Sequence, residues 1–202
     1  MTTGFIYLAS ASPRRRELLE QIGVPFRVLV PSVSEARAGD ESPETYVERV
    51  AADKAEQIWQ RVKAGEPAPV LAADTTVVVD GEMLGKPADE ADALAMLRRL
   101  SGRSHEVLTA IALRWREFKE ALVTVSEVRF RATTEAERVA YCRTGEPYDK
   151  AGAYAIQGRG AVFVEHLNGS YSAVMGLPLC ATASLLGRFG VPPWLGADGL
   201  QQ

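Results

Sequence analysis

The chain has 202 residues, of which 47% are hydrophobic and 24% charged, a composition typical of a globular protein with one substantial core or two lobes. The formal net charge is −3, so no overall positive field attracts nucleic acid or an acidic membrane. Two distant cysteines argue against a disulfide framework or zinc site, and no apolar run could span a bilayer. Because the N-terminus also lacks a signal-peptide pattern, we expect a soluble, cytoplasmic protein.

The first predicted elements alternate between strand and helix. Residues 4–9 (GFIYLA) are apolar and rich in β-formers, which predicts a short buried strand. Ser12 then fits the N-cap of a helix and Pro13 its first residue. Residues 25–32 (PFRVLVPS) predict a second strand, and a polar, flexible connection follows over 36–44.

The remaining elements continue this mixture of strands and helices. They are a helix over 42–65, two strands around Asp74, a hairpin turn at Asp80-Gly81, a helix over 89–102, strands over 105–115 and 121–132, a capped helix over 135–145, irregular strands over 150–171 and a helix over 181–189. This order predicts an α/β protein with a twisted mixed sheet and flanking helices. We expect a single domain over 1–202, with a frayed tail from about residue 191.

Three consecutive arginines, Arg14 to Arg16, occupy the first turn of the first predicted helix. Their charge opposes the helix dipole, at a cost of roughly 0.3–1 kcal/mol for each exposed cation. One interpretation is that the arginines simply extend into solvent. The other is an anion site, in which free backbone N–H groups, the guanidinium groups and the hydroxyls of Ser10 and Ser12 converge on a phosphate.

Lys54 interrupts the apolar stripe of the helix predicted over 42–65. At helical spacing this stripe consists of Val47, Val50, Ala51, Ile58 and Val62. A lysine at the edge of such a stripe can lay its stem on apolar surface and keep its ammonium group in water. Alternatively, the ammonium group faces an interior cleft, where it needs an anionic partner.

Asp74 interrupts an apolar, β-rich run, between VLAA and TTVVV, where a carboxylate is disfavoured. It could cap a turn between two strands, or it could be a metal ligand or general base held at a strand end. Lys86, in the stretch LGKP, could return to the same cleft or lie in an exposed turn. The two histidines, His105 and His166, have no metal-ligand spacing, so we expect both to be structural or exposed.

Four ordered stretches resemble the Maf family of nucleoside triphosphate pyrophosphatases. They are LASASPRRRELL, LAADTTVVVDGEMLGKP, LSGRSHEVLTAIAL and YDKAGAYAIQGRGAVFVEHLNGSYSAVMGLPL, which together run from the first strand to about Leu179. The family takes its name from septum formation in bacteria. The resemblance implies a fold similar to that of inosine triphosphate pyrophosphatases, two lobes around a deep cleft, a homodimer, and a divalent cation, Mg²⁺ or Mn²⁺.

The resemblance also implies roles for individual residues. Asp74 matches the family's catalytic carboxylate and proton acceptor, and Glu35 matches the last acid of a triplet that is Val33-Ser34-Glu35 here, without the family's middle acid. Both carboxylates are candidate metal ligands. The other matches are Ser10, Ser12, Arg14 and Arg15 beside the phosphates, Lys54 and Lys86 as the two family lysines, and Arg14, Thr75 and Gln157 at positions associated with substrate choice.

The stretch DKAGAYAIQG resembles the family branch that hydrolyses dTTP and UTP to the monophosphate and pyrophosphate. Two alternatives remain: hydrolysis of a modified purine nucleotide such as 7-methyl-GTP, and a nucleotide-binding regulator of cell division. Asp74 favours an enzyme, because a protein that only binds a triphosphate gains nothing from a carboxylate that repels it.

Overall fold

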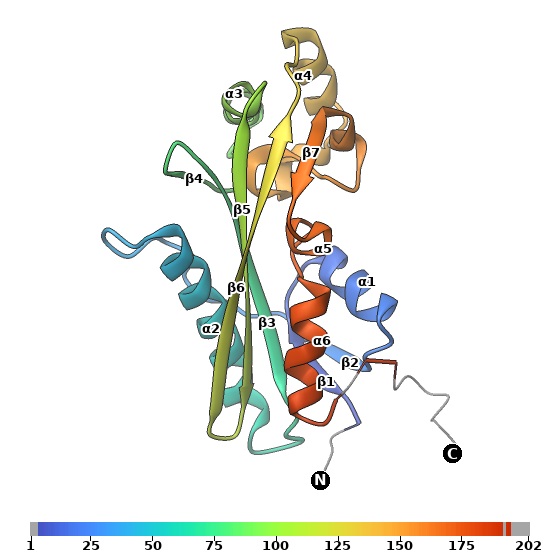
Figure 1. Cartoon of the computed structure of the whole chain (residues 1–202). Helices are drawn as coiled ribbons and strands as arrows, with labels where there is room; N and C mark the ends of the chain where they lie inside the picture. Colours follow the sequence, from blue (N-terminus) through green and yellow to red (C-terminus); the bar gives the residue numbers. More distant parts are fainter. Residues whose placement is uncertain (1–3, 192, 195–202) are drawn as a thin grey trace. The chain divides into compact units, whose positions relative to one another are not determined.

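The computed structural model describes residues 4–191, 193 and 194 (Figure 1). The strands are β1 (Ile6–Ala9), β2 (Phe26–Leu29), β3 (Val70–Val79), β4 (Glu82–Leu84), β5 (Ser104–Trp115), β6 (Phe118–Phe130) and β7 (Val164–Asn168). The α-helices are α1 (Pro13–Gln21), α2 (Pro43–Val62), α3 (Glu90–Leu100), α4 (Glu135–Cys142), α5 (Tyr171–Val174) and α6 (Leu179–Arg188), and short 3₁₀ helices span Glu146–Asp149, Ala151–Ala153 and Arg159–Phe163. Of the tail predicted to be frayed from about residue 191, only residues 191, 193 and 194 are described, and the rest lies outside the described residues.

The strands form one mixed sheet in the order β2-β1-β3-β5-β6-β7, with β4 paired to β3. β1 is parallel to both β2 and β3, whereas β4 is antiparallel to β3 and β7 is antiparallel to β6. The predicted α/β class with a mixed sheet and flanking helices is therefore confirmed. Among the described helices, none is long and apolar enough to cross a membrane.

The chain divides into two compact units. The first contains the described parts of Met1–Asp74, Thr109–Val123 and Gly176–Gln202, and the second contains Thr75–Leu108 and Thr124–Met175. Strands β3, β5 and β6 each contribute residues to both units. The single domain over 1–202 and the cleft between two lobes stay predictions.

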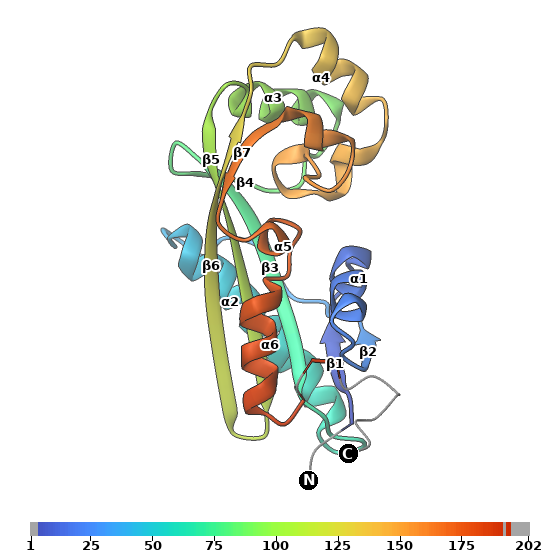
Figure 2. The ribbon, with the colours of Figure 1, turned by 45° about the vertical axis from the view of Figure 1, so that its right-hand side comes forward.

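In the first unit, helices cover both faces of the sheet. The chain passes from β1 through α1 to β2, and from β2 through α2 back across β1 to β3. Because such crossovers are right-handed, α1 and α2 must lie on opposite faces (Figures 1 and 2). Helix α2 begins where predicted, with the Ser42 side chain accepting a hydrogen bond from the Thr45 N–H, and its whole apolar stripe is buried.

The second unit closes around an aromatic core. Its hairpin turns at Asp80-Gly81 with positive φ at both residues (55° and 75°), as the sequence predicts. Thr134 and Glu137 form the predicted capping box of α4. The core itself contains His105, Tyr141, Phe130, Tyr154 and Phe163 in edge or tilted ring contacts.

Two local predictions are wrong. Asp74 does not separate two strands, because β3 runs without interruption through it. The stretch 150–163 is made of 3₁₀ turns rather than strands, since Gly152 and Ala153 have positive φ (70° and 59°) that breaks extended structure. The prediction that Ser12 is the N-cap residue of α1 and Pro13 its first residue is confirmed, although among the described contacts the Ser12 side chain does not cap the helix.

Both histidines behave as expected, and His105 offers a test of the second unit's core. His105 is 3% exposed, its Nε2 lies 2.9 Å from the Tyr154 hydroxyl, and burial lowers its pKa to about 4. His166 is exposed.

Since neutral His105 is buried while the unfolded chain binds a proton near pH 6.5, lowering the pH from 7 to 5 should cost about 2 kcal/mol of unfolding free energy through this group. Urea titrations of wild type and His105→Gln at both pH values measure this difference, with His166→Gln as the control. We expect the loss to shrink in His105→Gln and to persist in His166→Gln. An equal loss in all three proteins would contradict a buried, neutral His105.

Candidate active site

The carboxyl end of β1 carries a buried serine that organises the start of α1. Ser10 is 3% exposed, and its Oγ accepts hydrogen bonds from the Ser12 backbone N–H (3.1 Å) and from Arg15 Nη1 (3.4 Å). Ser12 thus contributes its backbone rather than its hydroxyl to this turn. The free N–H groups of the first helical turn begin directly after it.

The arginines of α1 do not share one environment. Arg15 is half-buried and folds back over the turn, where its Nε donates to the Gly176 carbonyl (2.8 Å). Burial lowers the pKa of Arg15, while the charges of Asp74 and Glu35 act in the opposite direction. Arg14 is also half-buried, whereas Arg16 is exposed. The interpretation that all three extend into solvent is therefore wrong for Arg15.

Lys54 lies between two carboxylates. Its Nζ is 2.8 Å from Asp74 Oδ1 and 2.5 Å from Glu35 Oε1. Lys54 and Asp74 are 8% and 7% exposed, whereas the Glu35 side chain is 49% exposed. The expectation that Lys54 points inward to an anionic partner is confirmed, and the alternative of an ammonium group in water is wrong.

Burial raises the pKa of Asp74, because the low-dielectric interior disfavours its charged form. The ammonium group of Lys54 and the guanidinium of Arg15 oppose this shift, and the charge of Glu35 adds to it. The result is a carboxylate more basic than one in water, with a cation in contact. This combination is typical of a group that accepts a proton during a reaction.

The sheet topology explains why these residues meet. Ala9 at the end of β1 pairs with Ala72, so Asp74 lies two residues past the last β1 partner on β3. The chain leaves β1 toward β2 on one side, while β3 lies on the other side. In open α/β sheets, ligands bind outside the carboxyl ends of the strands at such a point.

The donor set fits a divalent cation that is shared with a bound phosphate. No group of three or more His, Cys, Asp and Glu side chains converges on one position within the described residues. Glu35 and Asp74 do converge, on the ammonium group of Lys54. Mg²⁺ is commonly held by one or two carboxylates, with water and substrate phosphates completing the octahedron.

The other predicted site residues belong to the second unit. Thr75 follows Asp74 along β3 and is half-buried, Lys86 follows β4 and is exposed, and Gln157 is exposed on the turn before the third 3₁₀ helix. The structure therefore assembles Ser10, Arg15, Glu35, Lys54 and Asp74, and leaves the grouping of Thr75, Lys86 and Gln157 with them a prediction.

One residue of this site carries no signal in the sequence. The hydroxyl of Tyr46, on α2, donates a hydrogen bond to the Glu35 carbonyl (2.9 Å). Burial and the charges of Asp74 and Glu35 raise its pKa to about 12. Tyr46 stands beside the apolar stripe of α2 like many surface tyrosines, so only the three-dimensional structure reveals its contact with Glu35.

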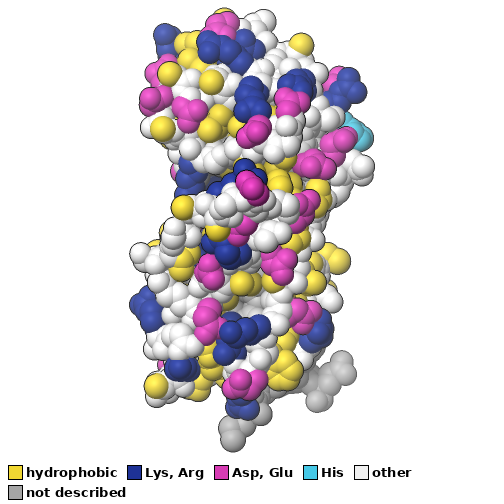
Figure 3. Space-filling view, turned by 90° about the vertical axis from the view of Figure 1, so that its left-hand side faces the viewer, with side chains coloured by type: hydrophobic (Ala, Val, Ile, Leu, Met, Phe, Trp, Pro, Cys, Tyr) yellow, Lys and Arg dark blue, Asp and Glu magenta, His cyan; other side chains and the backbone are white. Residues whose placement is uncertain are grey.

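The surface charge agrees with the low net charge. On the face drawn in Figure 3, basic and acidic side chains are interspersed, and neither kind gathers into an extended stripe.

The contacts of the Lys54 ammonium group with Asp74 and Glu35 should stabilise the folded protein, and the free energy of unfolding tests this. Lys54→Met should keep the fold but lower the free energy of unfolding at pH 7 by about 3 kcal/mol, because Asp74 stays buried without its cation. The loss should shrink as the pH falls through the raised pKa of Asp74, since a protonated carboxyl group needs no cation. Urea unfolding of Lys54→Met and of the double variant Lys54→Met/Asp74→Asn measures this, and the double variant should recover most of the loss. No recovery would contradict the pairing.

Comparisons with known proteins agree with the sequence motifs. The family model described as "Maf-like protein" matches residues 5–189. A protein of Bordetella avium named dTTP/UTP pyrophosphatase is 53% identical over 192 residues, covering 92% of this chain and 96% of that protein. Proteins of the same name from Xanthomonas oryzae pv. oryzae (strain MAFF 311018) and Saccharophagus degradans are 55% and 51% identical, covering 92% and 94% of this chain and 98% and 90% of theirs.

Among solved structures, the Staphylococcus aureus Ham1 protein matches with a TM-score of 0.42 and 15% identity, over 62% of this chain and 71% of that chain. This likeness is too low to carry an argument about fold or function. The family model spans nearly the whole chain, and the named relatives are 51–55% identical to it over the aligned residues. The chain belongs to the Maf family.

Proposed function

We propose that this protein hydrolyses dTTP and UTP to the nucleoside monophosphate and pyrophosphate. The observation that carries the proposal is the buried Lys54–Asp74 pair at the carboxyl end of β1, beside the arginine-bearing start of α1. The names of relatives that are 51–55% identical over the aligned residues support the same reaction and the same two nucleotides.

In the proposed reaction, water attacks the α-phosphorus atom and the bond from that atom to the bridging α–β oxygen breaks. Asp74 accepts the proton of the attacking water, a role for which its raised pKa makes it suited. Pyrophosphate leaves with the electron pair of the broken bond. Arg15, Lys54 and the free N–H groups of α1 stabilise the negative charge that develops on the phosphates.

We further propose that Glu35 and Asp74 would hold a divalent cation, Mg²⁺ or Mn²⁺, together with the substrate phosphates. Such a cation supplies charge neutralisation and polarises the phosphoryl oxygens. Lys54 would then act on the phosphates and would keep the two carboxylates from repelling each other while the site is free.

The family resemblance assigns further nucleotide contacts to Arg14, Thr75, Lys86 and Gln157. Exposed Lys86 is assigned to the β- and γ-phosphates. Exposed Gln157 offers an amide donor and an acceptor, which suits the O4 and N3–H edge of thymine or uracil. Thr75 and Arg14 complete the residues proposed to govern substrate choice. From the family resemblance, we also propose that the protein forms a homodimer and is located in the cytoplasm.

The first experiment is a nucleotide panel. Purified protein is incubated with dTTP, UTP, CTP, GTP and 7-methyl-GTP, with Mg²⁺ or Mn²⁺ or with excess EDTA, and pyrophosphate and orthophosphate are measured. We expect pyrophosphate from dTTP and UTP only with a cation. Sequential orthophosphate, or undiminished turnover in EDTA, would contradict the proposal. A preference for 7-methyl-GTP would favour the modified-purine alternative.

The second experiment replaces the proposed base. Asp74→Asn nearly preserves shape and should lower kcat by at least about 10²–10⁴-fold, because it removes the proton acceptor. Nucleotide binding should persist, since the basic contacts remain and a source of repulsion is gone. The melting temperature separates this from misfolding: a purely structural Asp74 would lose stability and activity together. A well-folded Asp74→Asn protein with the wild-type rate would contradict the mechanism, and a wild-type protein that binds dTTP without turnover would favour the regulator.

A further inference from the structure

The segment between β2 and α2 lies along α2 instead of extending freely into solvent. Residues 30–41, here called the strap, contain no helix or strand. The strap runs antiparallel to the helix, because its backbone groups meet side chains of α2 in reverse order: Val30 contacts Arg61, Ser32 contacts Gln57, and Ala36 contacts Arg49. In addition, the Glu35 carbonyl accepts a hydrogen bond from Tyr46, and the Glu35 carboxylate contacts Lys54. Of the polar connection expected to be flexible over 36–44, Ala36 is held on α2 in this way.

Two neighbouring carbonyl groups of the strap are held most directly. The Tyr46 hydroxyl donates to the carbonyl of Glu35 (2.9 Å), and Arg49 Nη2 donates to the carbonyl of Ala36 (3.0 Å). Positions 46 and 49 are three residues apart on α2, so their side chains emerge from the same side of the helix. Tyr46 and Arg49 therefore hold the backbone at Glu35, whose carboxylate contacts Lys54.

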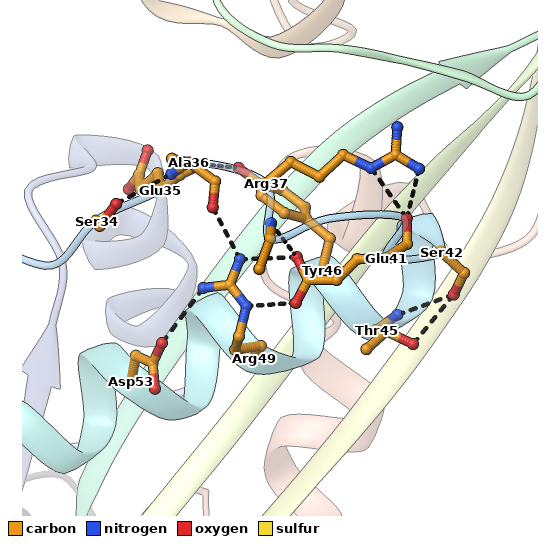
Figure 4. Close-up of polar contacts among 11 residues, drawn as sticks. Ser34, Glu35, Ala36, Arg37, Glu41, Ser42, Thr45, Tyr46, Arg49 and Asp53 are labelled. Carbon is orange, nitrogen blue, oxygen red and sulfur yellow. Dashed lines mark hydrogen bonds and ion pairs between the residues drawn. The ribbon is translucent and has the colours of Figure 1, made fainter.

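An ion pair closes the strap behind Glu35. Arg49 contacts Glu41 through two hydrogen bonds, from Nε to Oε1 (2.5 Å) and from Nη2 to Oε2 (2.9 Å) (Figure 4). Glu41 Oε2 also accepts the Ala38 N–H (3.0 Å), and Arg37 donates to the Glu41 carbonyl. The Glu41 side chain is only 11% exposed, and its bonds to Arg49 lower its pKa to about 2. A paired guanidinium fork of this kind constrains direction as well as distance.

The strap matters because it carries the carboxylate of Glu35 to Lys54. The Glu35 side chain is 49% exposed, and it comes from a segment with no regular backbone hydrogen bonds. An exposed glutamate on a free loop would lose much of its contact with Lys54 to side-chain and backbone entropy. The position of the strap therefore determines the fraction of time that the carboxylate of Glu35 contacts Lys54.

We propose that Tyr46 and Arg49 are positioning residues of the active site, which hold the strap on α2 and thereby keep Glu35 beside Lys54. This inference rests on the proposed function for its catalytic consequence. It assigns Tyr46 and Arg49 no contact with the substrate. It also predicts that both act through Glu35 alone.

Two conservative variants test the inference. Tyr46→Phe removes only a hydroxyl, and Arg49→Lys keeps a positive charge but loses the fork. Each should speed hydrogen exchange of the strap amides, and each should lower kcat for dTTP about 5- to 10-fold, the effect of one lost hydrogen bond. Arg27→Lys is the matched control, because Arg27 pairs with Glu66 in the same unit (2.5 Å) and does not touch the strap. It should change neither measurement.

A double-mutant cycle with Glu35→Gln separates positioning from general destabilisation. If Tyr46 acts through Glu35, then Tyr46→Phe should cost less than about twofold in kcat once Glu35 is already Gln. Equal losses in both backgrounds would overturn the inference. So would unchanged exchange of the strap in Tyr46→Phe and Arg49→Lys, or faster exchange with wild-type kcat.

The failure of the proposed function gives a different result. In that case wild-type protein fails to release pyrophosphate from dTTP, and the catalytic part of the inference falls with it. Hydrogen exchange still decides whether Tyr46 and Arg49 hold the strap. Wild-type turnover with additive losses, by contrast, would overturn only the inference.

Discussion

The site in the first unit depends on the ammonium group of Lys54, which contacts the carboxylates of both Asp74 and Glu35. Two carboxylates lie within 2.8 Å of one nitrogen atom, and one of them is almost fully buried. Without the cation, the buried charge of Asp74 would carry a desolvation cost of several kcal/mol, and Glu35 would repel it. With the cation, the chain keeps a basic carboxylate inside the protein without breaking the strand that carries it.

Four separate segments meet at this contact. β3 continues past the end of β1 and carries Asp74, α2 supplies Lys54, the strap supplies Glu35, and the turn from β1 into α1 supplies Ser10 and Arg15. The position of Arg15 near the start of α1 is thereby explained, because the charges of Asp74 and Glu35 act on it in the free protein. In the proposed complex, the helix dipole and this guanidinium group would act on the same phosphate charge.

Most helices, strands and turns could be predicted from local patterns in the sequence. The apolar stripe and Ser42-Pro43 predicted α2, the Asp80-Gly81 dipeptide predicted the hairpin, and Lys54 stood out because it interrupts a buried face. The errors arose where tertiary contacts override local preference. β3 tolerates Asp74 because Lys54, twenty residues away, neutralises it, and no local rule contains that information. The strap was missed for the same reason, since its hydrogen bonds join side chains of α2 to backbone groups of an irregular segment.

We propose that the reaction takes place beside Lys54 and Asp74 in the first unit. A crystal structure of the protein with the α,β-imido analogue of dTTP, whose scissile bond resists cleavage, is the decisive experiment. We expect the α-phosphoryl group within hydrogen-bond distance of Lys54 Nζ, with a water molecule between its phosphorus atom and the carboxylate of Asp74. A triphosphate bound elsewhere, or bound with Asp74 and Lys54 still paired and out of its reach, would rule this location out.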